Sequence, residues 1–588
     1  MAEAKRLHTP EGTPPSHQTL TAVDHSDNML QVLMGLYRKH QLTDYTVTAD
    51  GQSFHTHRNI LAAVSDYFHA MLTGDMLEAR QDHVDLKGVS ASAVKSLLDF
   101  AYTGELQLNL DDVIDVLAGA CHLQMHAAVE LCSRFLISEI AVKTSVDILN
   151  IADMFSLESV KDTAFSFILT SFDRVADTPD QFLKLHREHL HHLLESNDIA
   201  CPSELELFNH VLRWIEVSWE DRSECAPSLL EHVRFTLMRP EELVDSVAQS
   251  RVMTSDPRCR VYLDEALHYH VLPSRHPLMQ TGRTQVRNTP CMVAFGGRRG
   301  VNIGYKFNSN KMYALRNNTW QQLPDTESSF LFAAVAVVDN FLYVCGGMGK
   351  PAHAQATCQR FDPRTGTWTQ LAHMKVRRQS FPLVPYAGRL YAFGGGTSLG
   401  NMLDHPPTEC CESYLIDGNE WQSIAPMPLK YKASSATEHD GKIYVSGGRT
   451  ENKTVATMWC YVTTTDQWEE KSPMLLPHAG HTMMTINSQI YVIDRIDLTI
   501  ESYCPRADTW TQVAAPALEL SGVARPAIMS PWVYFISYVQ NGKDHRCCRY
   551  NVLTFECEEL PPYPEQVHCV IGVPLTFPRQ ALDANNNT

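Results

Sequence analysis

Residues 341–347 read FLYVCGG, a short apolar run with a tyrosine near its start and a pair of glycines at its end. Five further runs of the same kind occur along the chain, beginning with MVAFGG at residues 292–297. In these five runs the tyrosine position is occupied by Val293, Tyr391, Tyr444, Tyr491 and Tyr534. Four of the six runs end in a glycine pair, which permits a positive φ or the close approach of another backbone. The runs predict a repeated β-strand followed by a sharp turn.

A second signal follows each run: an aromatic residue and, seven residues later, a tryptophan. The pairs are Tyr313/Trp320, Phe361/Trp368, Tyr414/Trp421, Tyr461/Trp468, Tyr503/Trp510 and Tyr550/Cys557, the last with cysteine in place of tryptophan. Successive tryptophans lie 48, 53, 47 and 42 residues apart. Repeats of this length are typical of four-stranded β-propeller blades, with the tryptophan buried between neighbouring blades. The sequence therefore predicts an all-β propeller of six blades over residues 291–575.

The two ends of the repeat array predict how the propeller closes. Inner repeats carry an apolar strand before the tyrosine strand, such as AAVAVV at 333–338, whereas the first repeat begins directly at residue 291. The last repeat is followed by one strand too many, QVHCVIGVPL at 566–575. We expect this strand to complete blade one and so remove an open sheet edge.

Upstream of the repeats the pattern changes. YTVTADGQSFHTH at 45–57 alternates across an Asp50-Gly51 turn, which predicts a hairpin between helical segments. Further on, apolar residues recur at helical spacing with few strand signals. The predicted boundaries are 1–24 for a disordered tail, 25–130 for a mixed α/β domain, 131–272 for an all-α domain, 273–290 for a polar linker with three prolines, 291–575 for the propeller and 576–588 for a C-terminal tail.

Composition excludes several function classes. The 588 residues carry a formal charge of −18, which argues against a dominant role in nucleic-acid binding, since phosphates require a basic face. The start of the chain lacks an apolar signal core and no apolar run approaches the ~20 residues of a membrane span, so we expect a cytoplasmic or nuclear protein. The 16 cysteines form no C-x-x-C pair, which favours reduced thiols over a zinc site.

The glycine pairs with downstream aromatic and tryptophan residues resemble the kelch repeat, and the upstream half resembles a BTB (POZ) domain followed by a BACK domain. The BTB resemblance lies in LTDYTV at 42–47, SDYF at 65–68 and FAYTGEL at 100–106, and the BACK resemblance in FNHVLRW at 208–214. This order is that of the Kelch-like family. The chain departs from the kelch pattern at Asp494-Arg495 and Ser537-Tyr538, where glycine pairs are expected, and at Cys557.

The resemblance implies a non-catalytic adaptor that recruits substrates to a cullin-RING E3 ubiquitin ligase. The BTB domain would form a homodimer and dock a cullin of the third type, and the propeller would bind the substrate protein. Cullin contacts are expected at Met76, Leu77, Glu78 and Tyr102, although Tyr102 could instead belong to the core. Dimer contacts are expected along one helix face, at Met29, Leu30, Leu33, Met34 and Tyr37. The alternative is a cytoskeletal, actin-associated scaffold without a ligase role, because kelch proteins of both kinds share this fold.

Two further groups of residues are candidates for binding. Arg298-Arg299 and Arg377-Arg378 fall in inter-strand loops, where they could bind an acidic or phosphorylated peptide or simply be solvated. His186, His189, His191 and His192 could ligate a metal, but no cysteine or carboxylate pattern in the sequence completes a ligand set. We therefore expect a solvated helix there, and neither a metal nor a cofactor.

Overall fold

The computed structural model describes residues 25–74, 80–288, 290–299, 309–326, 330–349, 353–397, 405–494, 498–513, 526–536, 546–565 and 567–578. These residues fall into two compact units, one ending at His186 and the other starting at Arg187. The proposed tail at 1–24 lies outside the described residues, as do most of the proposed C-terminal tail and Ser537-Tyr538. None of the helices in the described ranges combines the length and apolarity that a bilayer-spanning helix needs.

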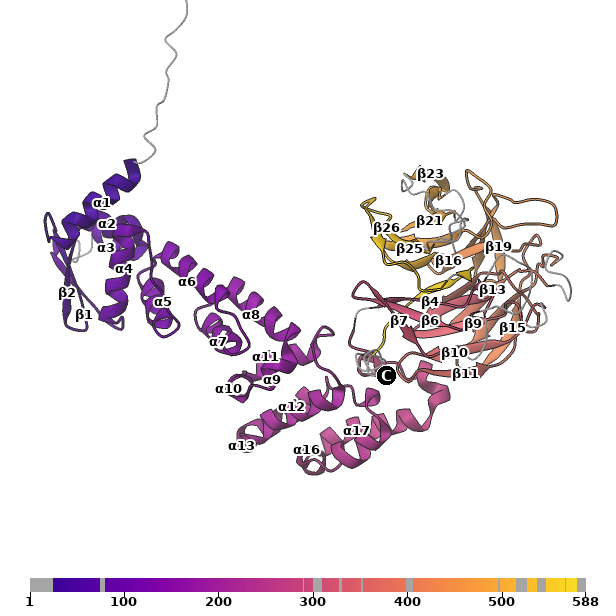
Figure 1. Cartoon of the computed structure of the whole chain (residues 1–588), viewed down its shortest axis with the longest axis horizontal. Coiled ribbons are helices and arrows are strands. Elements are labelled where there is room, and N and C mark those ends of the chain that lie inside the picture. Colours follow the sequence, from indigo (N-terminus) through magenta and orange to yellow (C-terminus); the bar gives the residue numbers. More distant parts are fainter. Residues whose placement is uncertain are drawn as a thin grey trace, which may run out of the picture. The chain divides into compact units, whose positions relative to one another are not determined.

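The first unit begins with a small sheet and neighbouring helices and continues as a series of helices that leads away from the sheet (Figure 1). Strand β1 (Tyr45–Ala49) pairs with β2 (Gln52–Thr56) across a turn in which Asp50 and Gly51 both have positive φ, so the predicted hairpin is confirmed. Strand β3 (His83–Leu86) lies parallel to β1 on its other side. The helices of this unit are α1 (His25–Arg38), α2 (Arg58–Val64), α3 (Asp66–Thr73), α4 (Ala91–Thr103), α5 (Val113–His122), α6 (His126–Ser138), α7 (Ser145–Met154), α8 (Glu158–Thr170), α9 (Phe172–Ala176) and α10 (Pro179–Phe182).

The second unit starts with helices and continues into the propeller. Helix α12 shows why this segment is helical: Ser203 caps it by accepting a hydrogen bond from the Glu206 amide, and its apolar residues bury one face. The helical elements are α11 (Arg187–Glu195), α12 (Glu204–Glu216), α13 (Trp219–Arg222), η2 (Ser223–Cys225), α14 (Ala226–Leu230), η3 (Phe235–Leu237), α15 (Pro240–Glu242), η4 (Leu243–Val247), α16 (Arg251–Ser255), α17 (Pro257–Val271), η5 (Pro273–Leu278) and η6 (Gly282–Thr284).

The described residues beyond 290 form six four-stranded antiparallel sheets, the blades of a propeller (Figure 1). Blade one contains β29 (Ile571–Leu575), β4 (Cys291–Phe295), β6 (Met312–Arg316) and β7 (Thr319–Leu323); blade two β8 (Ala334–Val338), β9 (Phe341–Cys345), β10 (Cys358–Asp362) and β11 (Thr367–Leu371); blade three β12 (Leu383–Tyr386), β13 (Arg389–Phe393), β14 (Cys411–Leu415) and β15 (Glu420–Ile424). Blade four contains β16 (Ser435–His439), β17 (Lys442–Ser446), β18 (Met458–Val462) and β19 (Gln467–Lys471); blade five β20 (Thr482–Ile486), β21 (Gln489–Ile493), β22 (Ile500–Cys504) and β23 (Thr509–Val513); blade six β24 (Ala527–Met529), β25 (Trp532–Ile536), β26 (Cys547–Asn551) and β27 (Cys557–Leu560).

The last strand closes the ring, as the sequence predicts. Strand β29 pairs antiparallel with β4, with Val573 opposite Val293 and Leu575 opposite Cys291. It also contacts the first strands of blades six and two, β24 and β8. Blade one is therefore built from the two ends of the repeat array, and its first strand is not left without a partner. The six-bladed kelch propeller is confirmed.

A repeated set of hydrogen bonds joins neighbouring blades. In blade four the Asp466 carboxylate accepts bonds from the Tyr461 hydroxyl at 2.7 Å and from the Ala425 amide of the preceding blade's loop at 2.8 Å. The Trp468 indole then donates to the carbonyl of Ala425 at 3.1 Å. We call this set of three hydrogen bonds the clamp. It also joins blade three to blade two, where Tyr414, Asn419 and Trp421 bond as above to Ala372. It joins blade five to blade four in the same way, through Tyr503, Asp508 and Trp510 and the backbone of Ser472. The tyrosine and tryptophan of the repeat thus act between blades.

The glycine pairs are explained by the backbone that lies against them. A Cβ atom on Gly346 would come within 2.5 Å of the Arg378 carbonyl oxygen, and one on Gly447 would come equally close to that of His478. Both glycines also have positive φ, at 63° and 56°. Each pair therefore turns the chain where the loop to the next blade crosses it.

The segment interpreted as a linker, 273–290, is packed against blade two along its described part. His276 stacks on Tyr269 with ring centroids 3.9 Å apart, and its Nδ1 lies 3.5 Å from the carboxylate of Asp362 on β10. Arg364 bonds Asp362 at 2.8 Å and donates to the carbonyl of Thr284 at 3.2 Å. These side chains are largely buried, so the segment joins the helices to the propeller through a fixed polar contact.

Candidate partner-binding surfaces

One end of the propeller carries both the loops between blades and the loops between the second and third strands of each blade. One residue just before the first strand of each of blades two to five has a φ between 52° and 72°. These residues are Phe332, Ser380, Ala433 and Gly480. Their backbones are joined by a series of hydrogen bonds. The amide of Gly480 donates to the carbonyl of Ala433 at 2.7 Å, the amide of Ala433 to the carbonyl of Ser380 at 2.7 Å, and the amide of Ser380 to the carbonyl of Phe332 at 3.0 Å. Together with Cys569 they surround a cavity of about 130 Å³. The mouth of the propeller is thus fixed by its main chain.

A larger hollow of about 590 Å³ opens beside this mouth, over blades three to five. Its wall includes Lys432, Arg449, Leu476, His478 and Asp494 from four successive loops. Because these residues come from loops on one face, the hollow can accept a peptide or side chain of a partner protein.

The loops around this hollow are basic, although the chain as a whole is acidic. We call their cations the basic loop face; they are Lys375, Arg377, Lys430, Lys432, Arg449 and Lys453. The exposed carboxylates on the described residues of the same loops are Glu409 and Glu451. Exposed leucines stand among the cations, with Leu475 51% and Leu429 49% exposed. This combination suits an acidic segment that also carries apolar side chains.

The sequence-predicted arginines differ in their surroundings. Arg377 is exposed on the basic loop face, whereas Arg378 is fully buried. The Arg378 guanidinium donates to the carbonyls of Gly394 at 2.9 Å and Cys410 at 2.8 Å and pairs with Glu412 at 3.3 Å. Its prediction as a partner-binding residue is corrected: it anchors the loop that presents Arg377. The backbone of Arg298 and Arg299 forms β5, paired with β28 (Val567–His568), and their side chains lie outside the described residues.

His478 occupies the position of Arg378 in the loop between blades four and five, and it is anchored differently. Its Nδ1 lies 2.9 Å from the Asp494 carboxylate and its Nε2 lies 3.0 Å from that of Glu501. Burial alone would lower the pKa of His478, but the hydrogen bonds with Asp494 and Glu501 raise it to about 9. Asp494, a departure from the glycine pattern, therefore serves as a partner of this imidazolium. Sequence reasoning missed His478, Lys432 and Arg449, although Met374, Met427 and Met474 mark the same place in each loop.

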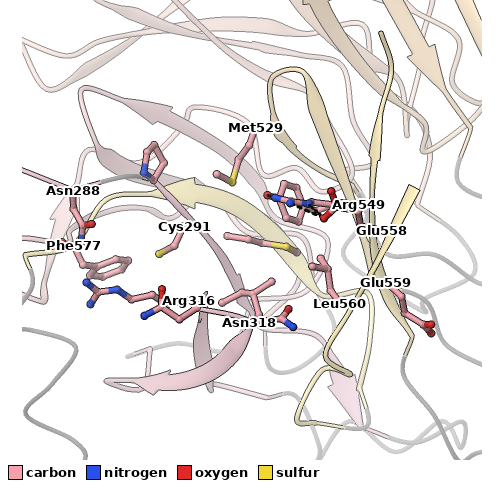
Figure 2. Close-up of a pocket in the computed structure, with 15 residues that line it drawn as sticks. Asn288, Cys291, Arg316, Asn318, Met529, Arg549, Glu558, Glu559, Leu560 and Phe577 are labelled. Atoms are coloured by element: carbon pink, nitrogen blue, oxygen red, sulfur yellow. Dashed lines mark hydrogen bonds and ion pairs between the residues drawn. The ribbon is translucent and has the colours of Figure 1, made fainter. Parts of the chain in front are cut away.

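A second hollow, of about 650 Å³, opens at the other end of the strands between blades one and six (Figure 2). Arg549 is fixed in its wall by Glu558, with two nitrogen–oxygen distances of 2.8 and 2.6 Å, and lies 4.4 Å above the Trp532 ring. Cys291 and Arg316 come from blade one. Because the charge of Arg549 is already paired with that of Glu558, this hollow is a weaker candidate for binding a partner than the basic loop face.

In the first unit, helix α1 lies on α4 and only part of its apolar face is covered. Met34 is buried, and Tyr37 stacks on Tyr102 with ring centroids 4.4 Å apart. Met29 and Val32 stay 53% and 64% exposed. Leu30 and Leu33 are half-buried. The helix therefore has apolar surface left for a partner, but at Met29 and Val32 rather than at Met34.

Of the residues predicted to contact the cullin, only Tyr102 lies among the described residues. Met76, Leu77 and Glu78 lie outside the described residues. Tyr102 is 1% exposed, and its hydroxyl contacts the His57 ring at 2.7 Å and accepts from the His57 amide at 3.1 Å. Its prediction as a cullin-contact residue is corrected in favour of the core alternative, because its hydroxyl and ring are both occupied inside the domain.

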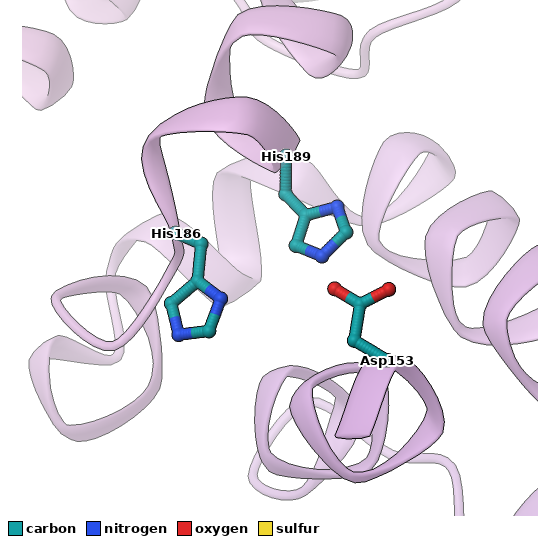
Figure 3. A group of neighbouring side chains, drawn as sticks. All are labelled: Asp153, His186 and His189. Carbon is teal, nitrogen blue, oxygen red and sulfur yellow. The ribbon is translucent and has the colours of Figure 1, made fainter. Parts of the chain in front are cut away.

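The histidines of the helical region also differ in their exposure. His189 lies on α11 and is buried, whereas His186 precedes that helix and is exposed (Figure 3). Asp153, near the end of α7, forms an ion pair with Lys161 at 2.7 Å. His191 and His192 lie further along α11, where they are half-buried and exposed.

The fold and these surfaces define a BTB–BACK–kelch protein. Residues 33–140 match the BTB/POZ domain, 145–248 match "BTB And C-terminal Kelch", and 330–375, 377–428 and 431–475 match the Kelch motif. Kelch-like protein 26 of Danio rerio is 34% identical over 584 residues, which cover 95% of this chain and 94% of the relative. The human Kelch-like protein 26 is 35% identical over 95% of this chain and 93% of its own length. The chain belongs to the Kelch-like family.

Proposed function

We propose that the chain is a substrate-recognition adaptor of a cullin-RING E3 ubiquitin ligase, without catalytic activity of its own. The observation that carries this is the complete series of modules, BTB, BACK and closed propeller, aligned end to end with Kelch-like relatives. The BTB domain docks a cullin of the third type and pairs with a second copy of the chain. The propeller holds the substrate, which the ligase then modifies.

Two surfaces support this division of work. Met29 and Val32 on α1 leave apolar side chains exposed in the BTB domain, as a self-association surface requires. The basic loop face and its hollow of about 590 Å³ offer the propeller a site for an acidic segment of a substrate. The cullin-docking residues are Met76 and Glu78, an apolar anchor beside a charge that sets orientation.

The test is a titration of a purified cullin N-terminal domain against the full chain and two variants. Met76→Ala with Glu78→Ala should weaken cullin affinity at least tenfold, which corresponds to ~1.4 kcal/mol, because apolar anchors can each contribute about 2 kcal/mol or more. Arg377→Glu with Arg449→Glu should leave cullin affinity unchanged. The same two variants, compared by proximity labelling, should show the reverse pattern for substrate, which only the loop-face variant loses.

The outcomes separate the two functions. A wild-type chain without cullin affinity would overturn the adaptor and favour the actin-associated scaffold, which co-sedimentation with actin filaments then checks. Equal cullin affinity of wild type and the Met76/Glu78 variant would keep the adaptor and move its docking site elsewhere. Substrate labelling that survives charge reversal would exclude the basic loop face as the substrate site.

A further inference from the structure

A cluster of histidine and glutamate side chains lies in the helical part of the second unit. Helix α11 carries His191, His192 and Glu195, whose potential ligand atoms all lie within 4.8 Å of one another. His232, just after α14, adds a fourth group: its Nε2 lies 3.1 Å from the Nε2 of His191. The sequence shows His191 and Glu195 four residues apart, but nothing in it indicates that His232 joins them.

The separation of the His191 and His232 ring nitrogens is close to that of two ligands in a coordination shell. Two imidazole nitrogens bound to one tetrahedral Zn²⁺ at about 2.0–2.1 Å stand roughly 3.3 Å apart, close to the 3.1 Å separation of the His191 and His232 nitrogens. His191 and Glu195 share a helix face, since residues four apart lie one above the other.

A buried arginine fixes the two elements that carry the cluster. Arg287 donates to the carbonyls of Leu194 at 2.7 Å and Ser196 at 2.6 Å, at the end of α11, and also to the carbonyl of His232. Its charge is matched by Glu204 at 2.8 Å, with both side chains largely buried. The backbones that carry His232 and Glu195 are thus held together before any ligand arrives, as ordered metal sites require.

We propose that His191, His192 and Glu195, with His232 beside His191 as a further donor, bind a divalent transition cation such as Zn²⁺. Imidazole with carboxylate is a donor set suited to Zn²⁺, Ni²⁺ or Cu²⁺ and poorly suited to Mg²⁺ or Ca²⁺. The cation joins α11 to the turn after α14, within the helical region that precedes the propeller. This site is independent of cullin or substrate binding.

The test is a titration of the full chain, without a histidine tag, with Co²⁺ as a spectroscopic stand-in for Zn²⁺. We expect one tetrahedral Co²⁺ per chain, displaced by Zn²⁺, with a spectrum that lacks the charge-transfer band of thiolate ligands. This last feature separates the site from the 16 cysteines. His191→Ala with His232→Ala should weaken Co²⁺ binding at least tenfold and abolish the rise in Tm that Zn²⁺ produces in the wild type.

Two controls keep the result specific. His83→Ala with His126→Ala removes two exposed histidines that each contact an aspartate, and it should bind Co²⁺ like the wild type. Glu195→Gln changes one exposed carboxylate without disturbing packing and should also weaken Co²⁺ binding. Weaker binding by this variant cannot be caused by a folding defect, which could otherwise explain the loss in the double variant. Equal Co²⁺ affinity of the wild type and the His191/His232 variant would overturn the proposal. A wild type that takes up no Co²⁺ would show that the two rings simply share a hydrogen bond.

Discussion

At the scale of single residues, one equivalent position in three successive loops between blades carries a different buried side chain in each loop. Arg378 pairs with Glu412 between blades two and three, Tyr431 receives a bond from the Trp459 indole at 3.2 Å, and His478 contacts two carboxylates. Each anchor fixes a loop whose neighbouring residues reach the hollow of the basic loop face. The His478 anchor differs from the other two because its charge depends on a proton that is lost as the pH rises through about 9.

The His478 contact makes propeller stability depend on pH. The folded pKa is about 9, above the ordinary 6.5, so the contribution is complete below pH 6.5 and is lost as pH rises through 9. A shift of this size corresponds to about 2–4 kcal/mol. We expect the Tm of the wild type to fall between pH 6.5 and 9 more steeply than that of His478→Gln, measured by calorimetry. The exposed His83→Gln variant should follow the wild type, and parallel curves for all three would show that His478 contributes no such dependence.

At the scale of elements, the clamps between blades follow the repeat only where its residues allow it. Blades three, four and five carry the tyrosine, the Asn or Asp, and the tryptophan that the clamp needs. Blade two has Phe361 and Gly366 at the first two positions, and blade six has Cys557 at the third. Blades two and six therefore depend more on apolar packing. Blade one carries Tyr313, Asn318 and Trp320, and its Trp320 indole donates to the carbonyl of Pro561, after blade six, at 2.9 Å.

Helix α1 is the element on which self-association depends. Met29→Asp with Val32→Asp places two carboxylates on its exposed apolar surface, and burying them unpaired in a dimer is costly. We expect a monomer at micromolar concentration by light scattering, with unchanged helicity because Met34 still packs inside the domain. Gln31→Asp, an exposed position on the same helix, should stay dimeric. An unchanged mass for the Met29/Val32 variant would remove this surface from the interface.

At the scale of the whole molecule, the propeller is one cooperative ring because its two chain ends share blade one. Removing the residues after Glu565 deletes β29 and the buried side chains Ile571, Val573, Leu575 and Phe577. At ~1.5–3 kcal/mol each these contribute about 6–12 kcal/mol, comparable to the ~5–15 kcal/mol that stabilise a domain. We expect the propeller transition to disappear from a thermal melt, whereas truncation after Pro578 should leave it unchanged. A melt of the shorter chain that matches the wild type would contradict the role of closure.

The sequence by itself determined the architecture, because the signals for it are local and repeated. The glycine pairs, the tyrosine and tryptophan spacing near 47 residues and the unpaired strand at 566–575 predict six blades and their closure. The hairpin at Asp50-Gly51 is equally local, because the residue types of the turn itself favour the positive φ angles that both residues adopt.

Only the tertiary structure decided which of the candidate residues face a partner. Arg377 and Arg378 are neighbours in sequence, yet the carbonyls of Gly394 and Cys410 enclose one and leave the other exposed. Tyr102 is covered by Tyr37, and His232 reaches His191 from 41 residues away. Burial and ligand geometry depend on side chains brought together by folding, so they are not encoded in the neighbourhood of any one residue.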